Sequence, residues 1–338
     1  MKSFDNPTAI AQKLTQWYEN NARHLPFRTT GDSYKIFLSE LMLQQTQVAT
    51  MIPYYERFIE RFPTIVDVAK ASEEEILKYW EGLGYYSRAR YVHKTATIVK
   101  EQYDGIFPSD LKTIESLKGI GRYTARAIHS IAFNQPSVAV DGNVMRVVSR
   151  LTLFDEDAKR TKSMRTVETS LQPLMNQSEP RIFTQAMMEL GALVCKKDPL
   201  CETCPLSEHC FAYKQNRQSE FPVIQKAKAK TQETYDVYVL DYAGSYYMVK
   251  RPEKGLLAGM WEFPMIQSEQ MLETLKRETN QTFEHTKFIG TVNHVFTHKI
   301  WTMHVYHVTL DQPINGMVNP YNFEGAISKA HKKIMELL

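Results

Sequence analysis

The sequence predicts a multidomain protein in which an all-α region, residues 1–213, is followed by a smaller α+β region, residues 234–338. Three observations support this prediction. The length of 338 residues suits about two domains. Before residue 220 the apolar residues recur with helical spacing. After residue 233 aromatic and β-branched residues alternate with the period of a strand.

The first region is expected to be a series of helices joined by short turns. Helical spacing is clearest over residues 33–48, 73–83 and 114–133. Ser72 stands where a helix N-cap is preferred, and the three glutamates after it suit the positive end of the helix dipole.

A polar and basic segment, residues 214–233, is expected to link the two regions. Beyond it, strands are predicted over residues 235–242, 245–250, 287–296 and 299–310, with a hairpin-like turn between the first two. Residues 268–280 and 327–338 have helical spacing.

Charge and composition limit the class of protein. The net charge of +3 is a weak indication of an anionic partner, but residues 118–150 carry five Lys or Arg side chains against one acid, Asp141, which favours phosphate. The first ten residues contain no apolar signal segment, and no run of about 18 apolar residues predicts a membrane span. We therefore expect a soluble, cytoplasmic protein.

All the cysteines of the chain lie within sixteen residues, at Cys195, Cys201, Cys204 and Cys210. Four thiolates in one loop suit a tetrahedral zinc ion or a [4Fe–4S] cluster. Zinc ligands usually form two pairs separated by a dozen or more residues, so the single compact loop favours iron–sulfur. Four unrelated buried cysteines are disfavoured, because charged and polar residues fill the gaps between them.

Gly119 and Gly121 lie between two helical stretches and predict a tight turn. Backbone N–H groups at the start of the second helix bind anions without contacting bases, and Lys118 and Arg122 add positive charge. A plain helix–turn–helix with a glycine C-cap is the alternative.

Two carboxylates stand in unusual places. Glu40 has Ile36, Phe37 and Leu43 as its helical neighbours, so it lies on a core-facing stripe. A partnered, buried carboxyl there suits a general acid. The alternatives are a buried carboxylate that caps a neighbouring helix, or a helix that is more exposed than its spacing indicates. Asp141 follows an apolar run and predicts a helix N-cap, a position that also favours its ionised form. An acid paired with an ionised carboxylate is the arrangement that cleaves glycosidic bonds.

Seven motifs, in order, resemble the helix-hairpin-helix DNA glycosylase superfamily and, within it, the MutY family of adenine DNA glycosylases. The match covers nearly the whole chain, and the motifs come in the family's order and approximate spacing. The motifs are LPFR (25–28), SELMLQQTQV (39–48), WEGLGYYSRAR (80–90), LKGIGRYTA (117–125), VDGNVMRV (140–147), MELGALVC (188–195) and the cysteine loop. The resemblance implies a six-helix barrel and an iron–sulfur domain with the active site between them, followed by a Nudix-like (MutT-like) domain.

The resemblance also implies roles for individual residues. Glu40 matches the acid that protonates N7 of adenine, and Asp141 matches the carboxylate that stabilises the cationic sugar, with Asn143 in support. Tyr123 stands where lyase members carry a lysine that forms a Schiff base, so a monofunctional enzyme that leaves an abasic site is implied.

Two further groups of residues carry over by motif. Gln45 and Tyr85 match residues that wedge into the duplex when the adenine is flipped out, although ordinary surface and core packing is the alternative reading. Phe27, Arg28 and Gln185 match the walls of the adenine pocket. Position 27 is Phe where the family often has Trp, and the first cysteine gap is five residues where six are usual.

The Nudix-like region lacks the catalytic glutamates of a pyrophosphatase, because Arg277–Glu278 is followed by Thr, Asn, Gln and Thr. The family uses this domain to recognise 8-oxoguanine, and its Phe-Ser-His loop matches Phe296, Thr297 and His298. The implied protein is a monomer of bacterial type, on the nucleoid when it binds double-stranded DNA with A:8-oxoguanine or A:G mispairs. A bifunctional glycosylase/lyase and a non-catalytic DNA-binding relative are the alternatives.

Overall fold

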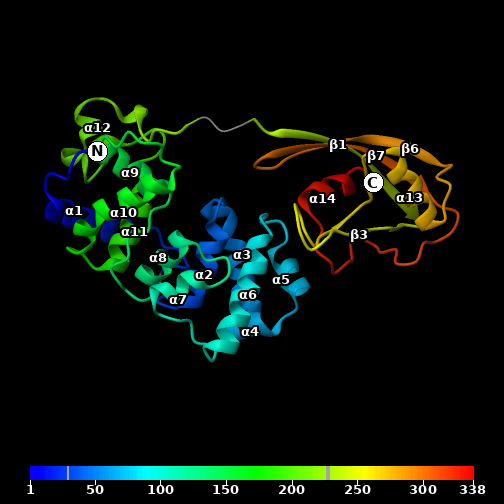
Figure 1. Cartoon of the computed structure of the whole chain (residues 1–338), viewed down its shortest axis with the longest axis horizontal. Coiled ribbons are helices and arrows are strands. Elements are labelled where there is room, and N and C mark those ends of the chain that lie inside the picture. Colours follow the sequence, from blue (N-terminus) through cyan, green and yellow to red (C-terminus); the bar gives the residue numbers. More distant parts are fainter. Residues whose placement is uncertain (29, 226–228) are drawn as a thin grey trace. The chain divides into compact units, whose positions relative to one another are not determined.

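The computed structural model describes residues 1–28, 30–225 and 229–338, and it divides into two compact units (Figure 1). The first unit comprises Met1–Lys70 and Tyr91–Lys226, and the second comprises Ala71–Arg90 and Ala227–Leu338. The second unit therefore contains a segment from the middle of the first region, and helix α6 (Ser87–Gln102) crosses the boundary between them.

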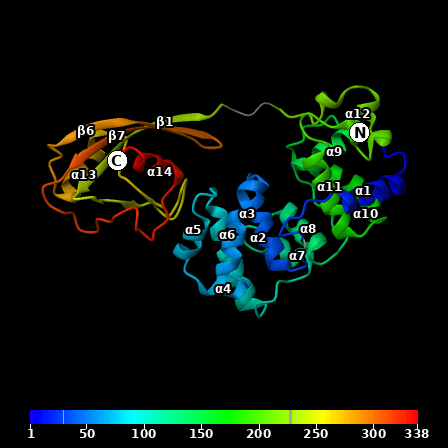
Figure 2. The ribbon, with the colours of Figure 1, turned by 180° about the vertical axis from the view of Figure 1, so that it is seen from behind.

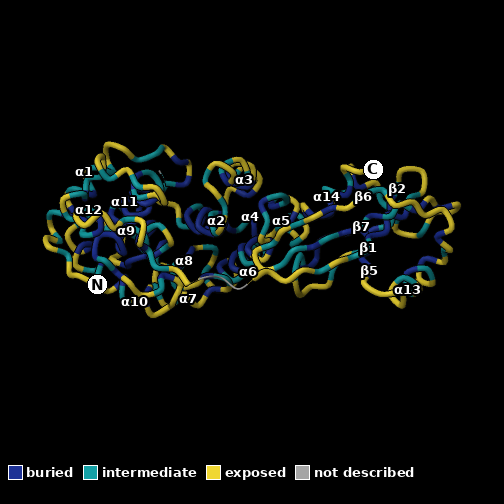
Figure 3. The backbone as a smooth tube through the Cα atoms, turned by 90° about the horizontal axis from the view of Figure 1, so that it is seen from above, coloured by how far each residue is buried: buried dark blue, intermediate teal, exposed yellow. Residues whose placement is uncertain are grey.

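Among its described residues, the first unit is made of helices and the loops that join them. Helix α2 explains the position of Glu40, because every residue from Ile36 to Met42 is buried and the helix is dark blue in Figure 3. Besides the part of α6 from Tyr91, its α-helices are α1 (Pro7–Asn21), α2 (Ser33–Leu43), α3 (Val48–Arg61), α4 (Ile65–Lys70), α7 (Leu111–Ser116), α8 (Arg122–Ile131), α9 (Gly142–Thr152), α10 (Thr161–Met175), α11 (Pro180–Leu193) and α12 (Phe211–Lys214).

The packing of these helices gathers four of them around one site. Helix α11 contacts α1, α8 and α9, while α2 contacts α3 and α8 (Figure 2). The N-terminal ends of α8 and α9 are set by Gly121 and Asp141, the two N-cap residues. The sequence predicted the Asp141 cap, and the structure confirms it.

The second unit is built on a sheet with the strand order β2-β1-β7-β6, and β5 pairs with β1. Strands β1 and β7 run parallel from Thr231↔Lys299 to Asp241↔Thr309, and β7 pairs antiparallel with β6. The strands are β1 (Thr231–Tyr242), β2 (Ser245–Tyr246), β5 (Met265–Ile266), β6 (Thr286–Val295) and β7 (Lys299–Thr309), and β3 (Val249–Lys250) pairs separately with β4 (Trp261–Glu262).

Each face of this sheet carries its own core, because alternate side chains point to opposite faces. On one face Val237 and Val305 pack with Ile334 of α14 (Lys329–Met335). On the other, Leu240 and Val308 pack with Leu275 of α13 (Glu269–Thr279). Helix α5 (Glu73–Trp80), the first element of this unit, is capped by Ser72 as predicted.

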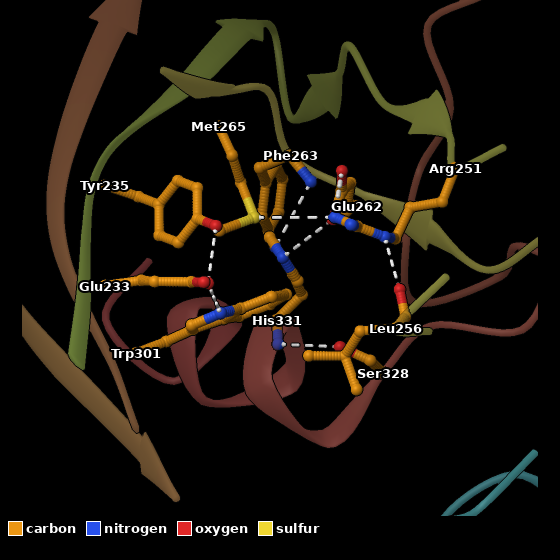
Figure 4. A network of polar contacts seen from close by, with 10 residues as sticks. All are labelled: Glu233, Tyr235, Arg251, Leu256, Glu262, Phe263, Met265, Trp301, Ser328 and His331. Atoms are coloured by element: carbon orange, nitrogen blue, oxygen red, sulfur yellow. Dashed lines mark hydrogen bonds and ion pairs between the residues drawn. The ribbon is translucent and has the colours of Figure 1, made fainter. Parts of the chain in front are cut away.

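A buried polar network fixes helix α14 to strand β4 (Figure 4). The imidazole of His331 is fully buried, its Nδ1 accepts the Phe263 N–H at 3.3 Å, and its Nε2 lies 3.4 Å from Glu262. Glu262 also accepts two hydrogen bonds from Arg251, at 2.8 and 2.5 Å. Ser328 caps α14 through the His331 N–H. The start of this helix is therefore held by side chains as well as by apolar packing.

Several boundaries differ from those expected. The stretch 245–250 forms two short strands rather than one, and β1 starts at Thr231, inside the expected linker. Much of that linker is attached to the first unit, since Phe221 is buried and the Ala158 N–H donates to the Val223 carbonyl. Residues 226–228 of the expected linker lie outside the described residues. Over the described chain, no helix is both long and apolar enough to span a bilayer.

Candidate active site

A pocket of about 310 Å³ opens in the first unit where α2, α8, α9 and α11 meet. The pocket joins residues that are more than a hundred positions apart in the sequence. Seven of the residues predicted from the sequence line it, namely Phe27, Arg28, Glu40, Gln45, Tyr123, Asp141 and Asn143.

Glu40 is held from two sides although its side chain is almost completely buried. The hydroxyl of Tyr123, in the first turn of α8, donates to Glu40 Oε2 at 2.8 Å. The guanidinium of Arg28 lies 3.4 Å from Glu40 Oε1. Burial and the nearby carboxylates raise the pKa of Tyr123 well above its usual value, so its hydroxyl remains a donor at neutral pH.

Asp141 enters the same pocket from the start of α9. Its Oδ1 accepts the Val144 N–H at 2.7 Å, and its Oδ2 accepts from the Asn143 side chain at 3.1 Å. Desolvation by burial raises the pKa of Asp141, and it outweighs the hydrogen bonds that lower it. The N-cap hydrogen bonds therefore favour the ionised form of Asp141, but burial disfavours it by more. The sequence did not reveal this effect of burial.

Phe27 gives the pocket an apolar wall, whereas the predicted pocket residue Gln185 is not among the residues that line it. Phe27 is buried and meets the Tyr55 ring edge-on at 5.8 Å, while the Arg28 guanidinium lies 5.4 Å from the Phe27 ring centre. Gln185 lies on α11 one turn before Met188 and Glu189, two residues that line the pocket. Its buried Oε1 has no hydrogen-bond partner among the described residues, so it is an unused acceptor.

Two polar contacts in this site escaped the sequence reasoning. Arg23 forms a two-pronged ion pair with Glu189 on the pocket wall, at 2.5 and 2.9 Å. Arg146, one turn after Asn143 on α9, donates to Asn143 Oδ1 at 2.8 Å and to the Cys195 carbonyl at 2.7 Å. The only signal in the sequence was the spacing of Asn143 and Arg146 on one helix face.

Known proteins with matching sequences identify the family. The helix-hairpin-helix superfamily of base excision DNA repair proteins matches residues 38–173, and a NUDIX domain matches residues 237–337. The adenine DNA glycosylase of Mus musculus is 34% identical, over 90% of this chain and 71% of its own length. That of Buchnera aphidicola subsp. Baizongia pistaciae is 35% identical, over 85% and 82%. The chain belongs to the adenine DNA glycosylase family.

Solved structures agree with this assignment over the helical part. A thermostable thymine-DNA glycosylase matches with a TM-score of 0.57 and 26% identity, covering 62% of this chain and 97% of that one. An endonuclease III–DNA complex matches with a TM-score of 0.53 and 25% identity, covering 62% and 98%. The predicted helix-hairpin-helix domain with a Nudix-like domain after it is therefore confirmed.

The hairpin of this adenine DNA glycosylase family member depends on close packing of its backbone. Gly119 has a φ of +81°, and a Cβ there would meet the Tyr91 ring at 2.2 Å. The Lys118 carbonyl accepts the Thr95 hydroxyl at 2.8 Å. Arg122, predicted to bind phosphate, makes three hydrogen bonds to the buried Glu168, the shortest 2.6 Å. Among the described residues no N-cap side chain hydrogen-bonds to the start of α8, and the phosphate-binding role of this turn stays a prediction.

The four cysteines of the glycosylase line one cavity, together with apolar residues such as Val147, Leu190 and Leu206. The five-residue first gap thus still lets the loop close. No three His, Cys, Asp or Glu side chains converge on a single ion site in the described ranges. Burial raises the pKa of Cys195, Cys204 and Cys210, that of Cys204 to about 12.

Arg150 organises this loop from α9. It is buried, and it donates to the carbonyls of Lys196, Lys197, Gln218 and Phe221 at 2.6 to 3.1 Å. Its Nη1 also lies 3.4 Å from Cys195 Sγ. The sequence counted Arg150 among the basic residues favouring phosphate, which is wrong for this residue because its donors are used inside the protein.

The predicted lesion-recognition residues of the glycosylase lie in both units. Gln45 lines the pocket with a φ of 57°. In the second unit the Tyr85 hydroxyl lies 2.5 Å from Thr297 Oγ1, in the turn between β6 and β7. Phe296 beside it packs on Trp301 at 4.8 Å, and the His298 carbonyl accepts the Thr231 N–H. Phe296 is thus packed, whereas Tyr85 keeps 43% of its surface exposed.

Proposed function

We propose that this protein excises adenine mispaired with 8-oxoguanine, and also adenine opposite G, in double-stranded DNA. The reaction is hydrolysis of the N-glycosidic bond, and it leaves an abasic site. The observation that carries the proposal is a buried carboxyl, Glu40, bonded to Tyr123 in the same pocket as the capped carboxylate of Asp141. An acid and a second carboxylate are the two groups this chemistry requires.

The chain's residues divide the steps between them. A flipped adenine enters the pocket, where Phe27 offers an apolar wall. Glu40 donates a proton to N7, so the base leaves as a neutral group and the sugar becomes an oxocarbenium-like cation. Asp141, steadied by Asn143, stabilises that cation until water adds. Glu40 is the base that accepts the proton of this water.

Tyr123 decides between this enzyme and a bifunctional glycosylase/lyase. A lyase needs an amine that attacks the sugar carbon and forms a Schiff base. The phenol at position 123 instead donates to Glu40, and its raised pKa keeps it protonated. We therefore propose a monofunctional enzyme. A covalent adduct trapped by borohydride on the wild-type protein would overturn this assignment.

Lesion recognition is assigned to the turn between β6 and β7. Thr297 keeps a hydroxyl that can hydrogen-bond to 8-oxoguanine, and Tyr85 stands beside it with an exposed ring. Gln45 is the second wedge, on the pocket side. An aromatic ring stacks on any base, so Tyr85 fills the space that the flipped adenine leaves.

The cysteine loop is proposed to hold a [4Fe–4S] cluster through Cys195, Cys201, Cys204 and Cys210. All four cysteines line one cavity, which supports the proposal because a cubane binds one cysteine at each of its irons. Binding of thiolates to metal offsets the burial that otherwise disfavours them. The cluster folds the loop and takes no part in the acid chemistry of Glu40.

The test is single-turnover excision on duplexes carrying A opposite 8-oxoguanine, G, C and T. We expect the fastest excision opposite 8-oxoguanine, slower excision opposite G, and little opposite C or T. Glu40→Gln should lose at least about 10²-fold in rate and keep duplex binding in a gel-shift assay. Excision by that variant at the wild-type rate would refute the assignment. Tight binding with no excision by the wild-type protein would favour a non-catalytic relative.

A further inference from the structure

The segment Ala71–Arg90 belongs to the second unit although it lies within the first region of the sequence. It contains α5 and the turn that carries Tyr85. Several contacts attach α5 to this unit. The Lys78 ammonium donates to the Phe323 carbonyl at 3.1 Å, and the Trp261 indole donates to Glu74 at 3.4 Å.

The turn after α5 is crossed by hydrogen bonds of its own. Arg88 donates to the Gly84 carbonyl at 2.9 Å and to the Tyr85 carbonyl at 3.4 Å, and the Trp80 indole donates to Gly84 at 3.1 Å. Tyr85 and Gly84 have positive φ values of 50° and 77°. Such a conformation persists only where the surroundings hold it. The position of the Tyr85 ring therefore depends on how the base of this turn is anchored.

Glu81 is the residue at that base, directly after the last turn of α5. Its side chain is only 7% exposed. Its Oε1 accepts the Lys332 ammonium at 2.7 Å and the Ile327 N–H at 3.3 Å, and its Oε2 lies 3.2 Å from Lys78. Lys332 follows His331, whose buried contacts fix the start of α14.

We propose that Glu81 is a positioning residue that sets Tyr85 against Thr297 and thereby determines the preference for 8-oxoguanine over G. The inference rests on the proposed role of Thr297 in lesion recognition. The Glu81 carboxylate is shielded from water and accepts from the Lys332 ammonium and the Ile327 N–H. Such an ion pair orients the turn more firmly than an exposed ion pair does. The tyrosine hydroxyl then meets the Thr297 hydroxyl at 2.5 Å.

The experiment compares Glu81→Gln with the wild type in single-turnover excision, on duplexes with A opposite 8-oxoguanine and opposite G. Gln keeps the shape and removes the charge that binds Lys332. We expect the ratio of the two rates to fall about ten-fold, with the rate opposite G changed less than about two-fold. Lys332→Gln, which removes the same ion pair from the other side, should give the same result.

The matched control is Glu273→Gln, which removes one charge from an exposed ion pair with Lys276 and should leave the ratio unchanged. A DNA-free measurement separates positioning from chemistry. In Glu81→Ala the Ile327 amide loses its acceptor, so its hydrogen exchange should speed up, whereas in Glu273→Gln it should not change.

Each other outcome has a definite meaning. If Thr297→Ala lowers the ratio and Glu81→Gln does not, this inference is wrong while the proposed function stands. If neither variant changes the ratio, the assigned role of Thr297 is wrong as well. If Glu81→Gln slows excision equally on both duplexes, the residue supports the fold or the chemistry and not the choice of lesion.

Discussion

Replacing Tyr123 by phenylalanine removes a single hydroxyl from the pocket and tests how Glu40 is held. In the wild type this hydroxyl donates to Glu40 Oε2 at 2.8 Å, and within the described residues the other oxygen meets only the Arg28 guanidinium, at 3.4 Å, without a hydrogen bond. The variant leaves a buried acceptor oxygen without its donor. A buried polar group left unsatisfied costs about 1–3 kcal/mol.

If the transition state is destabilised by this amount, the excision rate falls about 5- to 150-fold, because each 1.4 kcal/mol of activation free energy changes the rate about ten-fold. The assay is single-turnover excision of adenine opposite 8-oxoguanine at saturating enzyme. Tyr34→Phe is the matched control, because Tyr34 also donates a 2.8 Å hydrogen bond from a buried hydroxyl, to the Phe62 carbonyl outside the pocket. It should lower the melting temperature and keep the rate.

A Tyr123→Phe rate within two-fold of the wild type would refute the reasoning. The hydroxyl would then be a bystander, and Arg28 alone would hold the acid. An equal loss of rate in both tyrosine variants would also refute it, because the effect would then come from reduced stability of the unit.

Three further outcomes are expected. Burial raises the pKa of Asp141, so the carboxylate should gain a proton at a pH above the ordinary aspartate range and cease to stabilise the cation. The rate of excision should therefore decline as the pH falls through that value. Asp141→Asn should be slow and should lack that decline. Arg150→Gln removes donors to two carbonyls of the cysteine loop, those of Lys196 and Lys197, so iron and sulfide per chain should fall, whereas Arg217→Gln, at an exposed ion pair, should bind iron normally. Gly119→Ala meets the Tyr91 ring and a positive φ, so DNA affinity and stability should drop; Gly121→Ala, with open space around it, should change little.

The local patterns of the sequence predicted much of the candidate site. Glu40 on an apolar helix stripe and Asp141 before a helix both occupy the positions expected, because burial and N-capping depend on a few neighbouring residues. The compact cysteine spacing likewise implied one shared cavity, and the structure shows it.

Contacts between residues far apart in the sequence were not predicted. The arginines at 122, 146 and 150 looked alike in the sequence, as members of one basic cluster. Their partners are an acid on α10, a carbonyl at the end of the α11 region and a loop beyond it, and no local pattern specifies such contacts. The capture of residues 71–90 by the second unit was missed for the same reason. Helical spacing shows which face of α5 is apolar, but not which partner covers it.

That discontinuous second unit has a consequence for protein engineering. Expression of residues 1–226 alone, a natural choice for isolating the glycosylase part, would yield the whole first unit but only the Ala71–Arg90 segment of the second. In that fragment α5 and the residue after it would lack their partners in the second unit. Glu74 would lose Trp261, Lys78 would lose Phe323, and Glu81 would lose Lys332. Low stability or activity of such a fragment would then have two causes. One is the missing contacts of Ala71–Arg90, which the fragment still contains, and the other is the missing Nudix-like domain. The activity of the first unit would be tested more fairly in a circularly permuted chain or by co-expressing the two fragments.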